Sequence, residues 1–126
     1  MSAKPKTAVS PSFIAPAALL AHWQGHRGLT RRVIEAFPDD QLYTYSLGGM
    51  RTFGVMANEL LAIASPMMQG LVTGDWEDFA DADVDNKKDL LRLWDESTEE
   101  IDDFWSQLPG DGFGVYCGVQ PGAGFE

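Results

Sequence analysis

The sequence predicts an all-α protein with three helices, and three observations lead to this fold class. Apolar residues recur at three- and four-residue steps in three separate segments, which is the spacing of one face of a helix. Prolines stand where these segments would begin or end, at Pro16, Pro38 and Pro109. The last eighteen residues contain six glycines and two prolines, a composition that does not support a further helix.

The first predicted helix begins at Pro16 and continues for about six turns, until Pro38 ends it. Proline is favoured in the first turn of a helix because its missing N–H has no bond to make there. Gly25 and Gly28 weaken the interior by roughly 1 kcal/mol each relative to alanine. The residues expected to face the core are Leu19, Trp23, His26, Thr30, Val33 and Phe37.

The second predicted helix follows Thr52, whose side chain can cap it, and runs to about Met68. Pro66 is expected to kink or shorten its end. Glu59 stands out in this helix, because a buried ionised carboxylate is costly unless a cation or hydrogen-bond donors pair with it. The expected core face holds Val55 or Met56, then Glu59, Ile63 and Met67.

The acidic, turn-prone residues 70–84 are expected to form a long connection to a third helix, which runs from Asn86 to Leu108. The chain therefore divides into a flexible N-terminal arm (residues 1–15), a helical bundle (16–109) and a glycine-rich tail (110–126). The expected core face of the third helix consists of Leu90, Leu91, Trp94, Ile101, Trp105 and Leu108.

Charge and composition exclude several classes of partner. The net charge of −10 argues against sequence-independent binding to nucleic acid or to an anionic membrane. No stretch approaches the roughly 18 consecutive apolar residues of a membrane span, and no signal peptide is expected at the N-terminus. The single cysteine, Cys117, rules out an internal disulfide and is expected to be an unreactive thiol in a reducing cytoplasm.

The strongest local motif is the pair His22 and His26 in the first helix. Positions i and i+4 share a helix face, so both imidazoles can point at one metal ion. The alternative is that His26 is a hydrogen-bonded core histidine and His22 is exposed. Two histidines by themselves leave both interpretations open.

Glu59 bears on this choice. If the first two helices pack antiparallel, His26 and Glu59 fall at comparable heights, and inward-pointing carboxylates and imidazoles are how helix bundles build metal sites. Glu59 can instead rotate outwards, or pair with Arg27 or Arg51. Metal coordination by His26 and Glu59 and an ordinary ion pair therefore remain as alternatives.

Two other charged patterns bear on ion binding. The run from Asp81 to Asp85 fails as a calcium loop, because Asn86 stands where the motif needs glycine and Arg92 where it needs glutamate. The basic concentration in the first helix is expected to be a solvated face, with an anion site as the alternative. It consists of Arg27, Arg31 and Arg32.

Three stretches together resemble the DinB/YfiT-like superfamily of damage-inducible bacterial proteins with a proposed metal dependence. They are HWQGHRGLTRRVIEAFPDDQL, SLGGMRTFGVMANELLAIASPMMQGLVTGDW and LLRLWDESTEEIDDFWSQLP, and together they cover roughly residues 17–109. The resemblance rests on the order and spacing of these pieces, including the Arg-Thr-Phe-Gly that opens the second helix and the Leu-Pro that ends the third.

The resemblance implies an up-down-down-up four-helix bundle with a long connection between its second and third helices. It also implies a divalent metal ion (zinc, nickel or manganese), held by one histidine of the second helix and a histidine pair of the fourth. Some members are thiol transferases that use small thiols, others are isomerases or have no known activity, and dimers are common. For this chain it implies a metal-dependent hydrolase or thiol transferase acting on a small molecule, and a homodimer.

The chain departs from this pattern at two places. Glu59, or Asn58 if the alignment shifts by one, occupies the position of the second-helix histidine, and glutamate remains a competent ligand. The fourth helix is expected to be missing, so His26, Glu59 and His22 are the remaining candidate ligands of an incomplete site. An apolar groove would then be exposed, for the tail, a second chain or further sequence to cover. The alternative function is a non-catalytic, stress-associated bundle that binds a partner protein through this groove.

Overall fold

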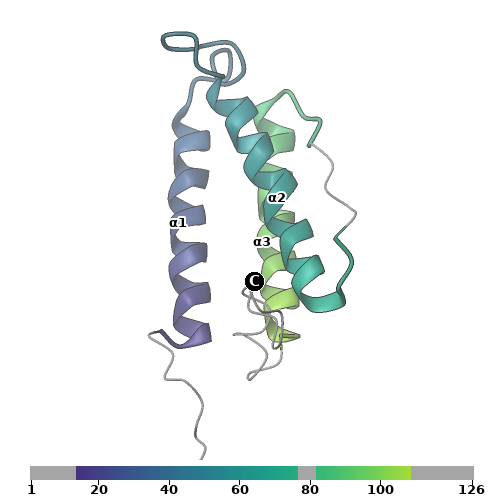
Figure 1. The fold of residues 1–126 in the computed structure, drawn as a ribbon. Helices are drawn as coiled ribbons and strands as arrows, with labels where there is room; N and C mark the ends of the chain where they lie inside the picture. Colours follow the sequence, from purple (N-terminus) through teal and green to yellow (C-terminus); the bar gives the residue numbers. More distant parts are fainter. Residues whose placement is uncertain (1–13, 77–81, 109–126) are drawn as a thin grey trace, which may run out of the picture.

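The computed structural model describes residues 14–76 and 82–108, and these form three α-helices without a strand (Figure 1). The helices are α1 (Pro16–Ala36), α2 (Phe53–Thr73) and α3 (Lys87–Ser106). The all-α prediction is confirmed for this part of the chain. Most of the predicted arm and all of the predicted tail lie outside the described residues, and so does Cys117.

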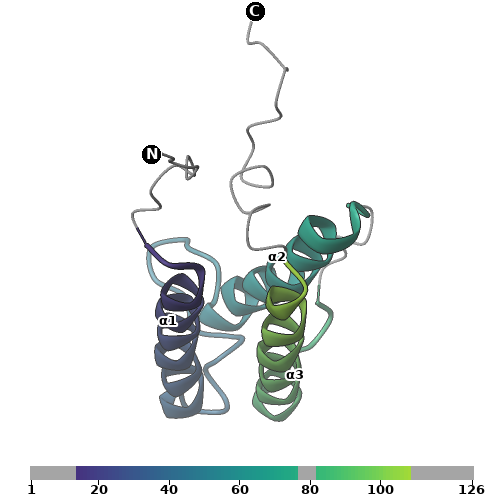
Figure 2. The ribbon, with the colours of Figure 1, turned by 90° about the horizontal axis from the view of Figure 1, so that it is seen from below.

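Both α1 and α2 pack against α3 (Figures 1 and 2). α1 is antiparallel to α3, because Lys87 at the start of α3 donates to the carbonyl of Glu35 at the end of α1, at 2.9 Å. At the opposite end, the rings of Trp23 and Trp105 lie 6.4 Å apart. The end of α1 meets the start of α2, where the ring of Phe37 stacks on the ring of Phe53.

α2 runs parallel to α3, so the three helices follow an up, down, down order. Leu61 shares one core cluster with Leu90, near the start of α3, and Met68 shares another with Ile101, near its end. A parallel pair needs a connection that returns along the full length of the helices. The described residues just before α3 lie beside the first half of α2, where the Asn58 side chain donates to the carbonyl of Val84 at 2.8 Å.

The helix starts are where the sequence places them, but the end of α2 is not. The Thr52 hydroxyl accepts a hydrogen bond from the N–H of Val55, which confirms it as the cap, and Asn86 caps α3 in the same way. The predicted end at Met68 was wrong, because α2 continues through Pro66 to Thr73. The turns beyond Pro66 are held by packing on Ile101, which outweighs the one backbone hydrogen bond that proline removes.

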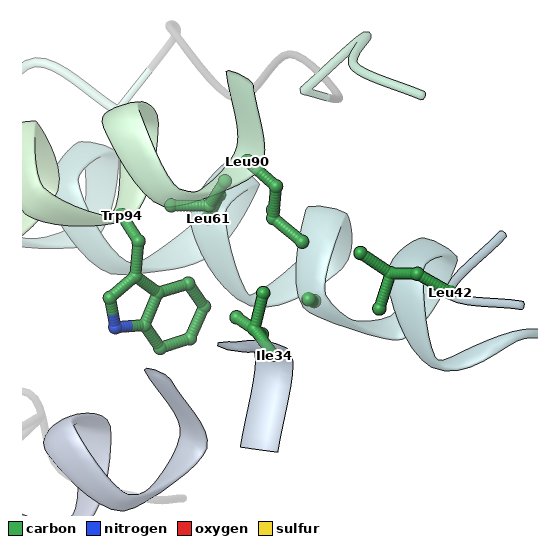
Figure 3. Packing of buried hydrophobic residues seen from close by; sticks show 6 residues of the cluster. Ile34, Leu42, Leu61, Leu90 and Trp94 are labelled. Carbon is green, nitrogen blue, oxygen red and sulfur yellow. The ribbon is translucent and has the colours of Figure 1, made fainter. Parts of the chain in front are cut away.

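The core lies along α3 in two clusters. The first joins the end of α1, the loop before α2, the first half of α2 and the start of α3, and its side chains point toward one another in Figure 3. It contains Ile34, Leu42, Ala57, Leu61, Leu90 and Trp94. The second cluster holds Ala64, Met68 and Ile101, against which Trp23 and Trp105 pack from the side.

The core face predicted for α3 is confirmed at Leu90, Trp94 and Ile101, but the faces of α1 and α2 were partly wrong. Ile63 is 51% exposed and Val33 is 45% exposed. The buried hydrophobic positions of α2 are instead Ala57, Leu61, Ala64 and Met68. Both helices carry more than one row of apolar residues at helical spacing, and spacing by itself does not say which row faces α3.

Replacing Gly25 or Gly54 by alanine is expected to change stability in opposite directions. A Cβ at Gly25 meets nothing within 4 Å, so Gly25→Ala should raise the free energy of unfolding by about 0.5–1 kcal/mol. A Cβ at Gly54 would lie 2.6 Å from ring carbons of Tyr43, whose hydroxyl donates to Asn58. Gly54→Ala should therefore lower it by about 1–3 kcal/mol. Urea denaturation measures both, and a stabilised Gly54→Ala would contradict this packing.

Candidate functional site

A groove runs between α1 and α2, with Trp94 of α3 at its floor. It consists of two hollows of about 360 and 400 Å³ that share His26, Thr30 and Leu60. We call this the α1–α2 groove. Its first hollow is lined by Trp23, His26, Arg27, Thr30, Leu60, Ile63, Ala64, Met67 and Trp94. Its second hollow adds Leu29, Val33, Phe53, Met56 and Ala57.

The walls of the α1–α2 groove are largely apolar and open to solvent. Leu29 and Val33 of α1 are 50% and 45% exposed, and Leu60 and Ile63 of α2 are 49% and 51% exposed. Scattered apolar side chains are normal on a surface, but a contiguous set that lines a groove is less common on a monomer. Leu29 and Val33 belong to a second apolar row on α1, and Leu60 and Ile63 belong to a second apolar row on α2. Neither row is part of the core.

Arg27 is buried at the edge of this groove and joins α1 to α3. Its Nη2 donates to the carbonyl of Trp94 and to the hydroxyls of Ser97 and Thr98, while its Nε donates to Gln24 at 3.1 Å. The guanidinium lies 4.5 Å from the centroid of the Trp94 ring, an arrangement in which the ring face attracts the cation. In return, the indole N–H of Trp94 donates to the carbonyl of Arg27 at 3.2 Å.

The charge of Arg27 has no carboxylate partner among the described residues. Arg27 is only 6% exposed, and this burial lowers the pKa of the guanidinium, while the negative charge of Asp102 acts in the opposite direction. Gln24 lies between Asp102 and Arg27: its amide nitrogen donates a hydrogen bond to the Asp102 carboxylate at 3.1 Å. Arginine stays protonated at neutral pH, so a positive charge sits beside the apolar hollow.

The structure brings His22 and His26 together. Their ring centroids lie 4.6 Å apart in an edge-to-face arrangement, and both residues are exposed. The interpretation of His26 as a core histidine was therefore wrong, because α1 turns Arg27 toward α3 and leaves His26 on the groove. A pair of imidazoles at this spacing can supply two ligands to one ion.

Glu59 is held away from this pair. Its carboxylate accepts a hydrogen bond from Arg51, the ion pair that the sequence left open as an alternative. Glu59 precedes the groove residue Leu60, so it is rotated by about 100° around α2 and is not among the residues that line the groove. Within residues 14–76 and 82–108, no three His, Cys, Asp or Glu side chains form a group that could hold a metal ion.

The expectation that the arginines of α1 form a solvated face was wrong at Arg27, which is buried, and these arginines do not form one anion site either. Arg27 points inward, whereas Arg31 makes a two-pronged ion pair with Asp95, at 2.6 and 2.9 Å, and a second pair with Glu35. Reasoning from the sequence missed Arg27 as a groove residue. A signal was present in α3, where Ser97 and Thr98 interrupt an apolar face and so indicate a polar side chain opposite them.

No family model matches the chain, and no curated protein matches it. α2 is long and apolar enough to cross a membrane by length and composition, and 28% of its most apolar window is buried in this fold. The buried share of α2 is low because one of its apolar rows packs on α3 while another lines the open α1–α2 groove.

The ion pair between Arg31 and Asp95 predicts a pH dependence. Hydrogen bonding and the charge of Arg31 hold the pKa of Asp95 below its ordinary value, partly offset by burial. A carboxyl whose pKa is lower in the folded state adds stability above its unfolded pKa of about 3.9, and this is lost as the pH falls through the folded pKa.

Asp95→Asn should therefore lower the free energy of unfolding at pH 7 by about 0.5 kcal/mol or less, because the pair is largely exposed. The difference from the wild type should be smaller at an acidic pH below the unfolded pKa of about 3.9, and it should shrink further as the pH falls. Urea denaturation at both pH values measures it, with Asp103→Asn on the exposed side of α3 as the control. A loss of stability in Asp95→Asn that is the same at pH 7 and at acidic pH would contradict the ion-pair assignment.

Proposed function

We propose that this chain is a non-catalytic helical-bundle protein that binds a helix of a partner protein in the α1–α2 groove. The observation that carries the proposal is the set of four half-exposed apolar side chains that line the two walls of this groove: Leu29, Val33, Leu60 and Ile63. Exposing such side chains to water is unfavourable by roughly 25 cal/mol for each Å² of apolar surface, and a bound partner would remove that cost.

The shape of the groove favours a helix as the occupant. Its walls extend from Trp23 to Val33 on α1 and from Phe53 to Met67 on α2. At a rise of 1.5 Å per residue these stretches are about 15 and 21 Å long, which corresponds to three or four helical turns. An amphipathic helix binds such a groove through apolar residues at positions i, i+3, i+4 and i+7.

Selection from a displayed library of amphipathic helical peptides tests this proposal. Peptides that bind the wild type should lose at least tenfold in affinity for the double variant Leu60→Gln/Ile63→Gln, because the apolar wall is lost while helix propensity is kept. Val55→Gln, at an exposed position of α2 outside the groove lining, is the matched control and should bind as the wild type does. A library that yields no peptide sensitive to the double variant would contradict the proposal.

A second copy of the chain is the competing occupant, since a homodimer was expected from the resemblance. Analytical ultracentrifugation separates the two cases. The proposed partner helix predicts the same sedimentation for the wild type and for Leu60→Gln/Ile63→Gln. A wild-type dimer that the double variant converts to a monomer would place a second copy in the groove instead.

Metal binding is the second candidate function, and the contact between His22 and His26 favours it. We propose that these two side chains bind a divalent ion such as zinc, nickel or manganese, as in a DinB-like hydrolase or thiol transferase. The up, down, down order of the helices agrees with that resemblance. Glu59 would coordinate the ion only after its ion pair with Arg51 is broken.

Calorimetric titration of untagged protein with Ni²⁺ or Zn²⁺ tests this second candidate. His22→Ala and His26→Ala should each weaken binding at least tenfold, because one imidazole of the pair is lost. Glu59→Gln should have no effect if the ion stays on the histidine pair, and a similar loss if Glu59 is a ligand. Binding that survives both histidine replacements would rule out this site.

A further inference from the structure

Arg27 is the one buried cation among the described residues, and it has no carboxylate of its own. Arg31, Arg51, Lys87 and Arg92 each lie within ion-pair distance of an aspartate or glutamate. Arg27 is more buried than any of them, yet its hydrogen bonds within the described residues go to neutral groups alone. Burying an unpaired charge is costly, so a buried cation without a carboxylate partner in an acidic protein calls for an explanation.

One nitrogen of Arg27 remains available for a partner. Nε and Nη2 make the hydrogen bonds to Gln24 and to α3, whereas Nη1 makes none to a described residue. In that part of the chain, every fully buried side-chain nitrogen and oxygen has a hydrogen-bond partner. Nη1 therefore retains exposed surface, and Arg27 is one of the residues that line the groove.

The surroundings of Nη1 favour a carboxylate as the missing partner. The hollow beside Arg27 is lined by apolar side chains together with His26 and Thr30, and no aspartate or glutamate is among its lining residues. A guanidinium in such an apolar setting binds a carboxylate strongly, through charge-assisted hydrogen bonds of defined geometry. A neutral apolar occupant would instead cover Nη1 and leave its N–H groups without acceptors.

We propose that the helix that binds the α1–α2 groove carries a glutamate or aspartate within its apolar face, and that this carboxylate pairs with Nη1 of Arg27. The inference rests on the proposed function, since it concerns the chemistry of the same groove. The apolar walls supply the contact area, and Arg27 selects among amphipathic helices for those with an acid at one position.

The test uses the library of helical peptides, with one central position of the apolar face fully randomised. Peptides selected on the wild type should have Glu or Asp at this position. Changing that residue to Gln should weaken binding to the wild type at least tenfold, because Nη1 loses its charged acceptor. Binding to Arg27→Met should be nearly the same for the Glu and Gln peptides.

Arg27→Met can fail to fold, because Arg27 joins α1 to α3, so a second measurement uses the wild type alone. The side-chain Nε–H resonance of Arg27 should shift on addition of the Glu peptide and much less with the Gln peptide. Equal affinities and equal shifts for the two peptides, with both sensitive to Leu60→Gln/Ile63→Gln, would overturn the inference and leave the proposed function standing. Loss of all groove-dependent binding would overturn the proposed function itself.

Discussion

The reciprocal contact between Arg27 and Trp94 is the interaction on which the rest of the structure depends. The guanidinium lies over the indole ring and bonds the Trp94 carbonyl, while the indole N–H bonds the Arg27 carbonyl. These bonds join the middle of α1 to the middle of α3. Lys87 and Trp105 join the two helices only at their ends. Gln24 and Arg31 also bond residues of α3 from positions next to this contact, so Arg27 and its two neighbours together set the rotation of α1 about its own axis.

That rotation also creates the groove. Because α1 turns Arg27 toward α3, the residue before it, His26, and the apolar row through Val33 are left facing α2. α2 packs on α3 with its own buried row and contributes Leu60 and Ile63 to the open side. The fold is thus stabilised along α3 and leaves an apolar surface between its other two helices, with one buried cation beside it. This arrangement supports the proposed binding function more directly than the proposed metal site, since Glu59 is engaged by Arg51.

Much of the fold could be predicted from local patterns, and the candidate site could not. Pro16, Thr52 and Asn86 act through bonds within one turn of the chain, so the helix starts were recognised correctly. The end of α2 was misplaced because packing on Ile101 carries the helix past Pro66. Glu59 was assigned to a core face because its spacing matches an apolar row, but that row faces away from α3.

The sequence by itself determined that the chain forms three amphipathic helices and where each begins, because propensity, capping and proline act over a few residues. Only the tertiary structure decided which of two apolar rows on α1 and α2 would be buried. That choice depends on contacts between residues far apart in the chain, above all Arg27 with Trp94, and helical periodicity is the same for both rows. Because of these contacts, the candidate site lies in the groove beside Arg27 and not at Glu59.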